Sequence, residues 1–80
     1  MSHDNIISSI QYIVRDVLDD ESLNIGANTS VADVEGWDSL AHINILSQIE
    51  SEFGVRFSLD EIANFSAVGN IAKAVQQKSS

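Results

Sequence analysis

Hydrophobic residues recur every three or four positions in the first part of this chain, which is the spacing of one helix face. The repeat consists of Ile6, Ile7, Ile10, Ile13, Val14, Val17 and Leu18. We expect a helix that begins with Asp4 as its N-cap and ends near Leu18. The acidic run at residues 19–21 supports that end, because negative charge is unfavourable at a helix C-terminus.

A second repeat predicts a helix from Ser39 to about Phe53, with Gly54 as the stop signal. Its expected inward stripe is Leu40, Ile43, Leu46, Ile49 and Phe53. The positions expected to face outward include Ala41, His42, Asn44, Ser47 and Gln48.

Two further helices follow. Ser58 with Glu61 three residues later is a capping-box pattern, and it predicts a short helix that ends at Phe65. Ser66 is the expected cap of the last helix. The residues expected to face inward there are Val68, Ile71, Ala72 and Val75.

Residues 20–37 are polar and rich in turn formers. A connection of this length is unusual in a compact domain unless it is tied down. We expect Leu23, Ile25, Val31 and Val34 to pin it across the bundle, with a short helical turn at residues 30–34. No segment predicts a strand. The sequence thus predicts one all-α domain over residues 1–80, a four-helix bundle of three long helices and one short helix with a long loop between the first and second helices.

The composition narrows the possible functions. The 80 residues include no cysteine, so disulfides and thiolate zinc sites are excluded. Twelve acidic residues against four basic ones give a net charge of −8. That charge disfavours nucleic acid and favours basic protein partners, although it also simply confers solubility. No apolar run reaches the ~20 residues of a membrane span and no signal peptide is evident, so we expect a cytoplasmic protein.

Ser39 is the candidate for chemistry. Asp38 is a good N-cap residue, which places Ser39 in the first turn of the second helix with its hydroxyl accessible. The first N–H groups of a helix are unpaired and carry partial positive charge, so they suit a phosphate. Ser39 is therefore a plausible attachment point for a phosphodiester-linked group.

The chain resembles the acyl and peptidyl carrier proteins along nearly its whole length. The motifs that carry the resemblance are Gly-Trp-Asp-Ser-Leu at residues 36–40, Ile-Glu-Ser-Glu-Phe-Gly-Val at 49–55 and Phe-Ser-Ala-Val at 65–68. The resemblance implies that a phosphopantetheinyl transferase attaches 4′-phosphopantetheine from coenzyme A to Ser39, flanked by Asp38 and Leu40. The terminal thiol of that arm would carry an acyl or aminoacyl group as a thioester. The chain has no thiol of its own, so the cofactor would supply the chemistry, with no catalytic residue and no metal in the protein.

The resemblance also implies enzyme partners that load and process the cargo, and a protein that visits many partners works best as a monomer. We expect those enzymes to contact the second helix and its approach loop. The expected contact residues are Trp37, Ala41, His42, Asn44, Glu50 and Glu52. Trp37 could instead pack against the bundle. Leu40 is a candidate both for the core and for contact with the phosphopantetheine arm.

One departure bears on the pathway. Carriers of general fatty acid synthesis usually have a second helix dense in exposed acids, whereas only Glu50 and Glu52 follow Asp38 here. A dedicated carrier in a specialised pathway fits better, such as polyketide synthesis, lipid or saccharide acylation, or amino acid activation.

Two other functions remain open from the residues alone. One is an acidic helical adaptor that binds a basic partner without modification. The other is a small hydrolase with Ser39 as nucleophile and His42 as base, three residues apart on one helix. No third group accompanies that pair, and so small a bundle is not expected to enclose a pocket.

Overall fold

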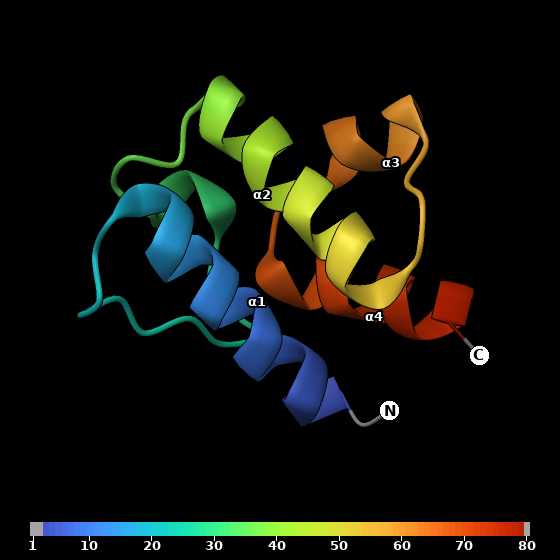
Figure 1. Ribbon diagram of the computed structural model, residues 1–80. Coiled ribbons are helices and arrows are strands. Elements are labelled where there is room, and N and C mark those ends of the chain that lie inside the picture. Colours follow the sequence, from blue (N-terminus) through green and yellow to red (C-terminus); the bar gives the residue numbers. More distant parts are fainter. Residues whose placement is uncertain (1–2, 80) are drawn as a thin grey trace.

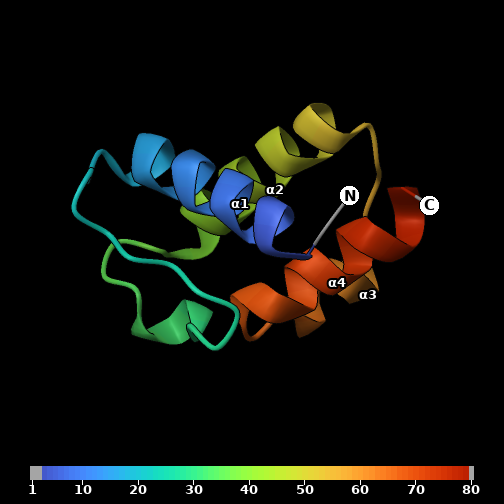
Figure 2. The same ribbon diagram turned by 90° about the horizontal axis from the view of Figure 1, so that it is seen from below.

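The computed structural model describes residues 3–79, which form four α-helices and one turn of 3₁₀ helix. In chain order these are α1 (His3–Leu18), η1 (Val31–Asp33), α2 (Ser39–Phe53), α3 (Leu59–Asn64) and α4 (Val68–Ser79). α1 packs against both α2 and α4. Seen from below, α1 and α2 lie on one side of the molecule and α3 and α4 on the other (Figure 2). The predicted bundle of three long helices and one short helix is confirmed.

Three faces meet in the core. The completely or almost completely buried side chains are Ile6, Ile10 and Val14 from α1, Ile45, Leu46 and Ile49 from α2, and Val68, Ile71, Ala72 and Val75 from α4. The inward stripes predicted for the first and last helices are therefore correct. Within residues 3–79, no helix has the length and apolarity to cross a bilayer.

The ends of α1 differ in how well the sequence predicted them. The helix begins at His3, so Asp4 lies inside the first turn and is not the N-cap that we expected. An acidic residue there still interacts favourably with the positive end of the helix. The predicted end at Leu18 is correct. Asp19 adopts a left-handed conformation (φ 54°), and the N–H of Asp20 turns back to the carbonyl of Arg15 at 3.0 Å.

The inward face of α2 is rotated relative to the prediction. Leu40 and Ile43 were expected in the core, but they are 69% and 59% exposed. The buried residues of the helix are Ala41, Ile45, Leu46 and Ile49. Two apolar stripes can be drawn on this helix, one through 40, 43 and 46 and one through 41, 45 and 49, and spacing alone does not choose between them. Packing against α1 buries the second stripe together with Leu46, so the expected burial of Leu46 and Ile49 is correct and that of Leu40 and Ile43 is not.

The first half of the long loop is fixed by side chains of α1. Arg15 Nε donates to the carbonyl of Leu23 at 2.6 Å, and the side-chain oxygen of Gln11 accepts from the N–H of Ile25 at 2.6 Å. Ile25 and Val34 are buried, Leu23 and Val31 are half-buried, and η1 forms the expected turn. The prediction that these residues pin the loop is confirmed.

The middle of the loop is fixed by the connection between α3 and α4. Three main-chain hydrogen bonds of 2.9 Å join them: Val31 N–H to Ser66 O, Val68 N–H to Thr29 O, and Gly69 N–H to Ala27 O. Val68 and Gly69 open α4, so their N–H groups have no acceptor inside the helix. The loop carbonyls satisfy them, and in return the helix start holds the loop.

Ser66 does not cap α4 as we predicted. The residue directly before the helix is Ala67, whose N–H donates to the Asn70 side chain at 3.0 Å. The Ser66 hydroxyl faces the same Asn70 oxygen at 3.3 Å. Because the first-turn donors of α4 are taken by the loop carbonyls, no serine cap is needed there.

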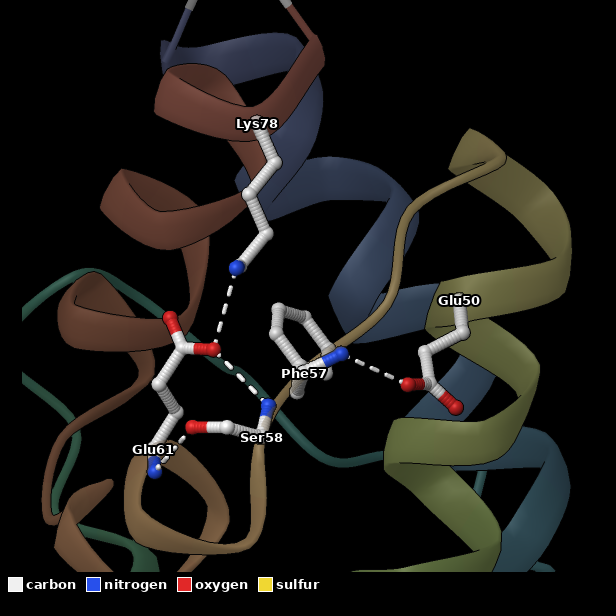
Figure 3. A network of polar contacts seen from close by, with 5 residues as sticks. All are labelled: Glu50, Phe57, Ser58, Glu61 and Lys78. Carbon is white, nitrogen blue, oxygen red and sulfur yellow. Dashed lines mark hydrogen bonds and ion pairs between the residues drawn. The ribbon is translucent and has the colours of Figure 1, made fainter.

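The short helix α3 is held by the polar network in Figure 3. Ser58 and Glu61 form the predicted capping box, and Glu61 also pairs with Lys78 of α4 at 3.0 Å. The Ser58 N–H and then Lys78 lower the pKa of the Glu61 carboxyl. The network therefore stabilises the fold above the unfolded-state pKa, and the contribution is lost as the pH falls through the lowered value. In the segment that leads from α2 to α3, the Phe57 N–H donates to the Glu50 carboxylate at 2.8 Å.

The contact between α4 and the loop predicts a specific role for Gly69. A Cβ added there would lie 2.7 Å from the backbone oxygen of Ala27, which cannot move without shifting the loop. We expect Gly69→Ala to lower the free energy of unfolding by about 1–2 kcal/mol, after the gain in helix propensity is offset. The matched control is Gly26→Ala, whose added Cβ has its nearest neighbour, Thr29 Oγ1, at 4.0 Å. Urea unfolding of both variants gives the comparison, and equal midpoints would refute the close contact.

Candidate functional site

Ser39 is the first residue of α2 and is exposed. In Figure 1 the start of α2 lies at the end of the molecule opposite the first turn of α1 and the last turn of α4. Asp38 precedes it in an extended conformation (φ −92°, ψ −172°), and its side chain accepts from the Ala41 N–H at 2.8 Å. Its carbonyl accepts from the His42 N–H at 2.8 Å. Asp38 is therefore the N-cap, as predicted, and it fixes the direction in which the helix starts.

The start of α2 has the donors that a phosphate needs. Among residues 3–79 the structure shows no acceptor for the N–H groups of Ser39 and Leu40, which are the first two of the helix. The Asp38 side chain is engaged with Ala41, one residue further along. An exposed hydroxyl beside two unpaired N–H groups at the positive end of a 15-residue helix fits a phosphodiester on Ser39.

The chain turns sharply just before the site. The Trp37 N–H donates to the Val34 carbonyl at 3.2 Å, and the Asp38 N–H donates to the Gly36 carbonyl at 3.0 Å. Gly36 has a φ of 89°, a conformation that side chains strongly disfavour. A Cβ there would meet only Leu18 Cδ2 at 3.8 Å, so backbone conformation rather than space requires glycine.

Trp37 and His42 form a contact that sequence reasoning missed. Trp37 is buried, as one of its two interpretations predicted, and its indole N–H donates to His42 Nδ1 at 2.9 Å. His42 Nε2 lies 3.0 Å from the carbonyl oxygen of Ile62 in α3. Both ring nitrogens are thus engaged away from Ser39. His42 is half-buried rather than fully exposed as expected, and it is not placed to take the serine proton, so the hydrolase hypothesis loses its base.

The structure separates the residues predicted to contact partners. Asn44 and Glu52 are exposed, and Glu50 is half-buried and bonded to the backbone. Ala41 was expected to face outward, but it is buried because of the rotation of α2. The exposed apolar residue that the prediction missed is Ile43, one turn beyond Ser39 and Leu40. The sequence contained a sign of this exposure, because α2 has more apolar residues than one helix face can bury.

The comparisons with known proteins agree with this geometry. The family described as "Phosphopantetheine attachment site" matches residues 8–75. An acyl carrier protein from Thermotoga maritima is 27% identical over 77 residues, which cover 96% of this chain and 95% of that protein. The solution structure of a holo acyl carrier protein from Geobacter metallireducens superposes with a TM-score of 0.82 at 33% identity, covering 91% of this chain and 84% of that one.

These matches decide between the three functions that the sequence left open. The matched family is described by its attachment site for phosphopantetheine, and the two similar proteins are acyl carrier proteins, which are carriers rather than enzymes. The matched range contains the capped start of α2 with Ser39 exposed on it, and the helical architecture agrees with a solved holo carrier. The chain therefore belongs to the family of proteins with a phosphopantetheine attachment site.

Proposed function

We propose that this protein is an acyl carrier protein and that Ser39 carries its 4′-phosphopantetheine. The observation that carries the assignment is the exposed Ser39 hydroxyl at the start of α2, beside two unpaired N–H groups and behind a fixed N-cap. Similarity to acyl carrier proteins over nearly the whole chain supports it. The arm's thiol then holds the cargo as a thioester, while the protein supplies a rigid and recognisable platform.

The attachment step balances with coenzyme A as donor and a phosphopantetheinyl transferase as catalyst. The Ser39 oxygen forms a new bond to the phosphorus that bears pantetheine. The pyrophosphate P–O bond breaks, the adenosine bisphosphate leaves, and the hydroxyl proton is released. His42 does not act as the base in this step, because both of its ring nitrogens are engaged, with Trp37 and with Ile62.

We further propose a specialised pathway, in which the cargo is a polyketide, lipid, saccharide-linked acyl or aminoacyl intermediate. The support is the sparse acidity of the exposed face of α2, where the Glu50 carboxylate is already bonded to a backbone N–H. The setting that fits is the cytoplasm, with the single domain of residues 1–80 acting as a monomer. The class of cargo is read directly from the mass of the thioester on protein isolated from the cells that make it.

The enzymes that load and process the cargo are proposed to dock on the exposed face of α2 next to Ser39. Leu40 and Ile43 supply the apolar centre of this face, in place of the buried Ala41 and Trp37. Asn44 and Glu52 lie on its exposed rim. Exposed aliphatic side chains one turn apart give a partner apolar area to bury, while the net charge of −8 accelerates encounter with basic surfaces.

The assignment of Ser39 predicts a specific change of mass. Incubation with coenzyme A and a phosphopantetheinyl transferase should add one phosphopantetheine to the wild type and none to Ser39→Ala. The matched control is Ser47→Ala, since Ser47 is also exposed on α2 but lies mid-helix. Intact-mass spectrometry measures all three, and circular dichroism should show the same helicity because exposed serines contribute little to stability. Modification that persists in Ser39→Ala would refute the site.

If partners dock on this face of α2, a negative charge introduced there should slow transfer onto the carrier more than the same charge on another exposed surface. Leu40→Asp and Ile43→Asp should each lower kcat/KM for transfer onto the carrier about tenfold, the equivalent of one good apolar contact. Tyr12→Asp is the control, because Tyr12 is 77% exposed on α1. Transfer kinetics with the transferase and one loading enzyme provide the measurement. If Tyr12→Asp is the damaging change and the two α2 variants are normal, partners dock on α1 instead.

A further inference from the structure

His42 joins three parts of the molecule through one ring. Its backbone belongs to α2, its Nδ1 lies 2.9 Å from the indole nitrogen of Trp37, and its Nε2 lies 3.0 Å from the carbonyl oxygen of Ile62 in α3. An indole N–H only donates and a carbonyl only accepts. Both bonds are therefore satisfied in one neutral tautomer, with the ring proton on Nε2 and the lone pair on Nδ1 directed at Trp37.

The element on one side of this ring is not stable by itself. α3 has only six residues, which is too short to persist without tertiary contacts. Its other attachments include the Glu61–Lys78 ion pair with α4 and the packing of Ile62 against the core. The segments on either side of α3 are held by the Glu50 bond to the Phe57 N–H and by the edge-to-face contact of Phe57 and Phe65, with ring centroids 5.2 Å apart. The ion pair is partly exposed, so it is worth little alone. The bond from His42 fixes α3 on the side that faces α2.

The element on the other side is the segment that presents Ser39. Trp37 stands two residues before it and is 8% exposed. A buried indole N–H without an acceptor loses about 1–3 kcal/mol, so the position of Trp37 depends on the lone pair of His42. The rings are tilted by 43° with centroids 6.0 Å apart, which leaves the hydrogen bond as their specific link.

We propose that His42 is a positioning residue that couples α3 to the segment carrying Ser39. When α3 moves away from α2, the Nε2 bond breaks and the ring is free to rotate. Rotation takes Nδ1 away from Trp37 and loosens the turn before Ser39. A cargo or partner that displaces α3 is thereby sensed at the attachment site. This consequence rests on the proposed function, whereas the coupling itself is a property of the unmodified chain.

Two substitutions separate the two bonds. In His42→Asn the side-chain oxygen lies about where Nδ1 was and keeps an acceptor for Trp37, but the donor to Ile62 is lost. In His42→Gln the amide nitrogen reaches about as far as Nε2 and keeps that donor, but the acceptor at the Nδ1 position is lost. Trp37 is the only tryptophan, so its indole N–H gives a single resonance in ¹⁵N-labelled protein.

The experiment measures hydrogen exchange of that indole N–H and of the amides of α3 in unmodified wild type, His42→Asn and His42→Gln. Coupling predicts that each variant accelerates exchange at both places, by about fivefold for one lost hydrogen bond. If His42→Asn affects α3 alone and His42→Gln affects Trp37 alone, the two contacts are independent and the proposal is wrong. The ¹⁵N chemical shifts of the His42 imidazole in the wild type, recorded with the ring neutral, show which ring nitrogen carries the proton. This measurement does not depend on whether a variant folds. A proton on Nδ1 would also overturn the proposal.

A kinetic arm connects the coupling to the site. Both variants should raise the KM of the transferase for the carrier about fivefold with kcat little changed, because Ser39 itself is intact but is presented in more orientations. An unchanged KM overturns the consequence for Ser39. A wild type that accepts no phosphopantetheine would refute the proposed function, and the exchange data would still decide the coupling.

Discussion

The unpaired N–H groups at helix starts are the constraint on which this structure depends. Every helix leaves its first donors without internal partners, and two helix starts of this chain differ in whether those donors find an acceptor elsewhere. At α4, the carbonyls of Ala27 and Thr29 accept from Gly69 and Val68, which ties the long loop to the bundle. At α2, Asp38 accepts from Ala41, while the N–H groups of the exposed residues Ser39 and Leu40 have no acceptor within residues 3–79. The first arrangement fixes the loop, and the second leaves donors that fit the phosphate proposed on Ser39.

The two arrangements serve one purpose, because the loop tied down at α4 leads to Ser39. Gln11 and Arg15 hold its first half, and the bonds to the connection between α3 and α4 hold its middle. Trp37, bonded to His42, holds its last residues. A carrier needs a mobile arm on a fixed base, since partner enzymes recognise the base while the arm enters their active sites. The loop, although without regular secondary structure apart from η1, is the part that fixes the base.

Helix caps and helix bounds, which depend on residues close together in the sequence, were predictable from it. The Ser58–Glu61 capping box, the stop at Gly54, the N-cap at Asp38 and the bounds of α2 all follow from local chemistry, and the structure confirms each of them. Features that depend on residues far apart were not. Burial of Ala41 and exposure of Ile43 follow from how α2 packs on α1, and the partner of His42 is a carbonyl twenty residues away. The Ser66 cap failed for the same reason, because the loop supplies the acceptors at α4.

The proposed carrier function depends on Ser39 holding the prosthetic group in the cell. The most direct measurement is peptide mapping by tandem mass spectrometry of the protein isolated from the cells that make it, without added transferase. We expect phosphopantetheine on the peptide that contains Ser39, with cargo on its thiol in part of the population. Ser47 and Ser51, which are exposed on the same helix but lie beyond its first turn, should be unmodified. Phosphopantetheine on either of those serines, or a chain that carries none, would contradict it.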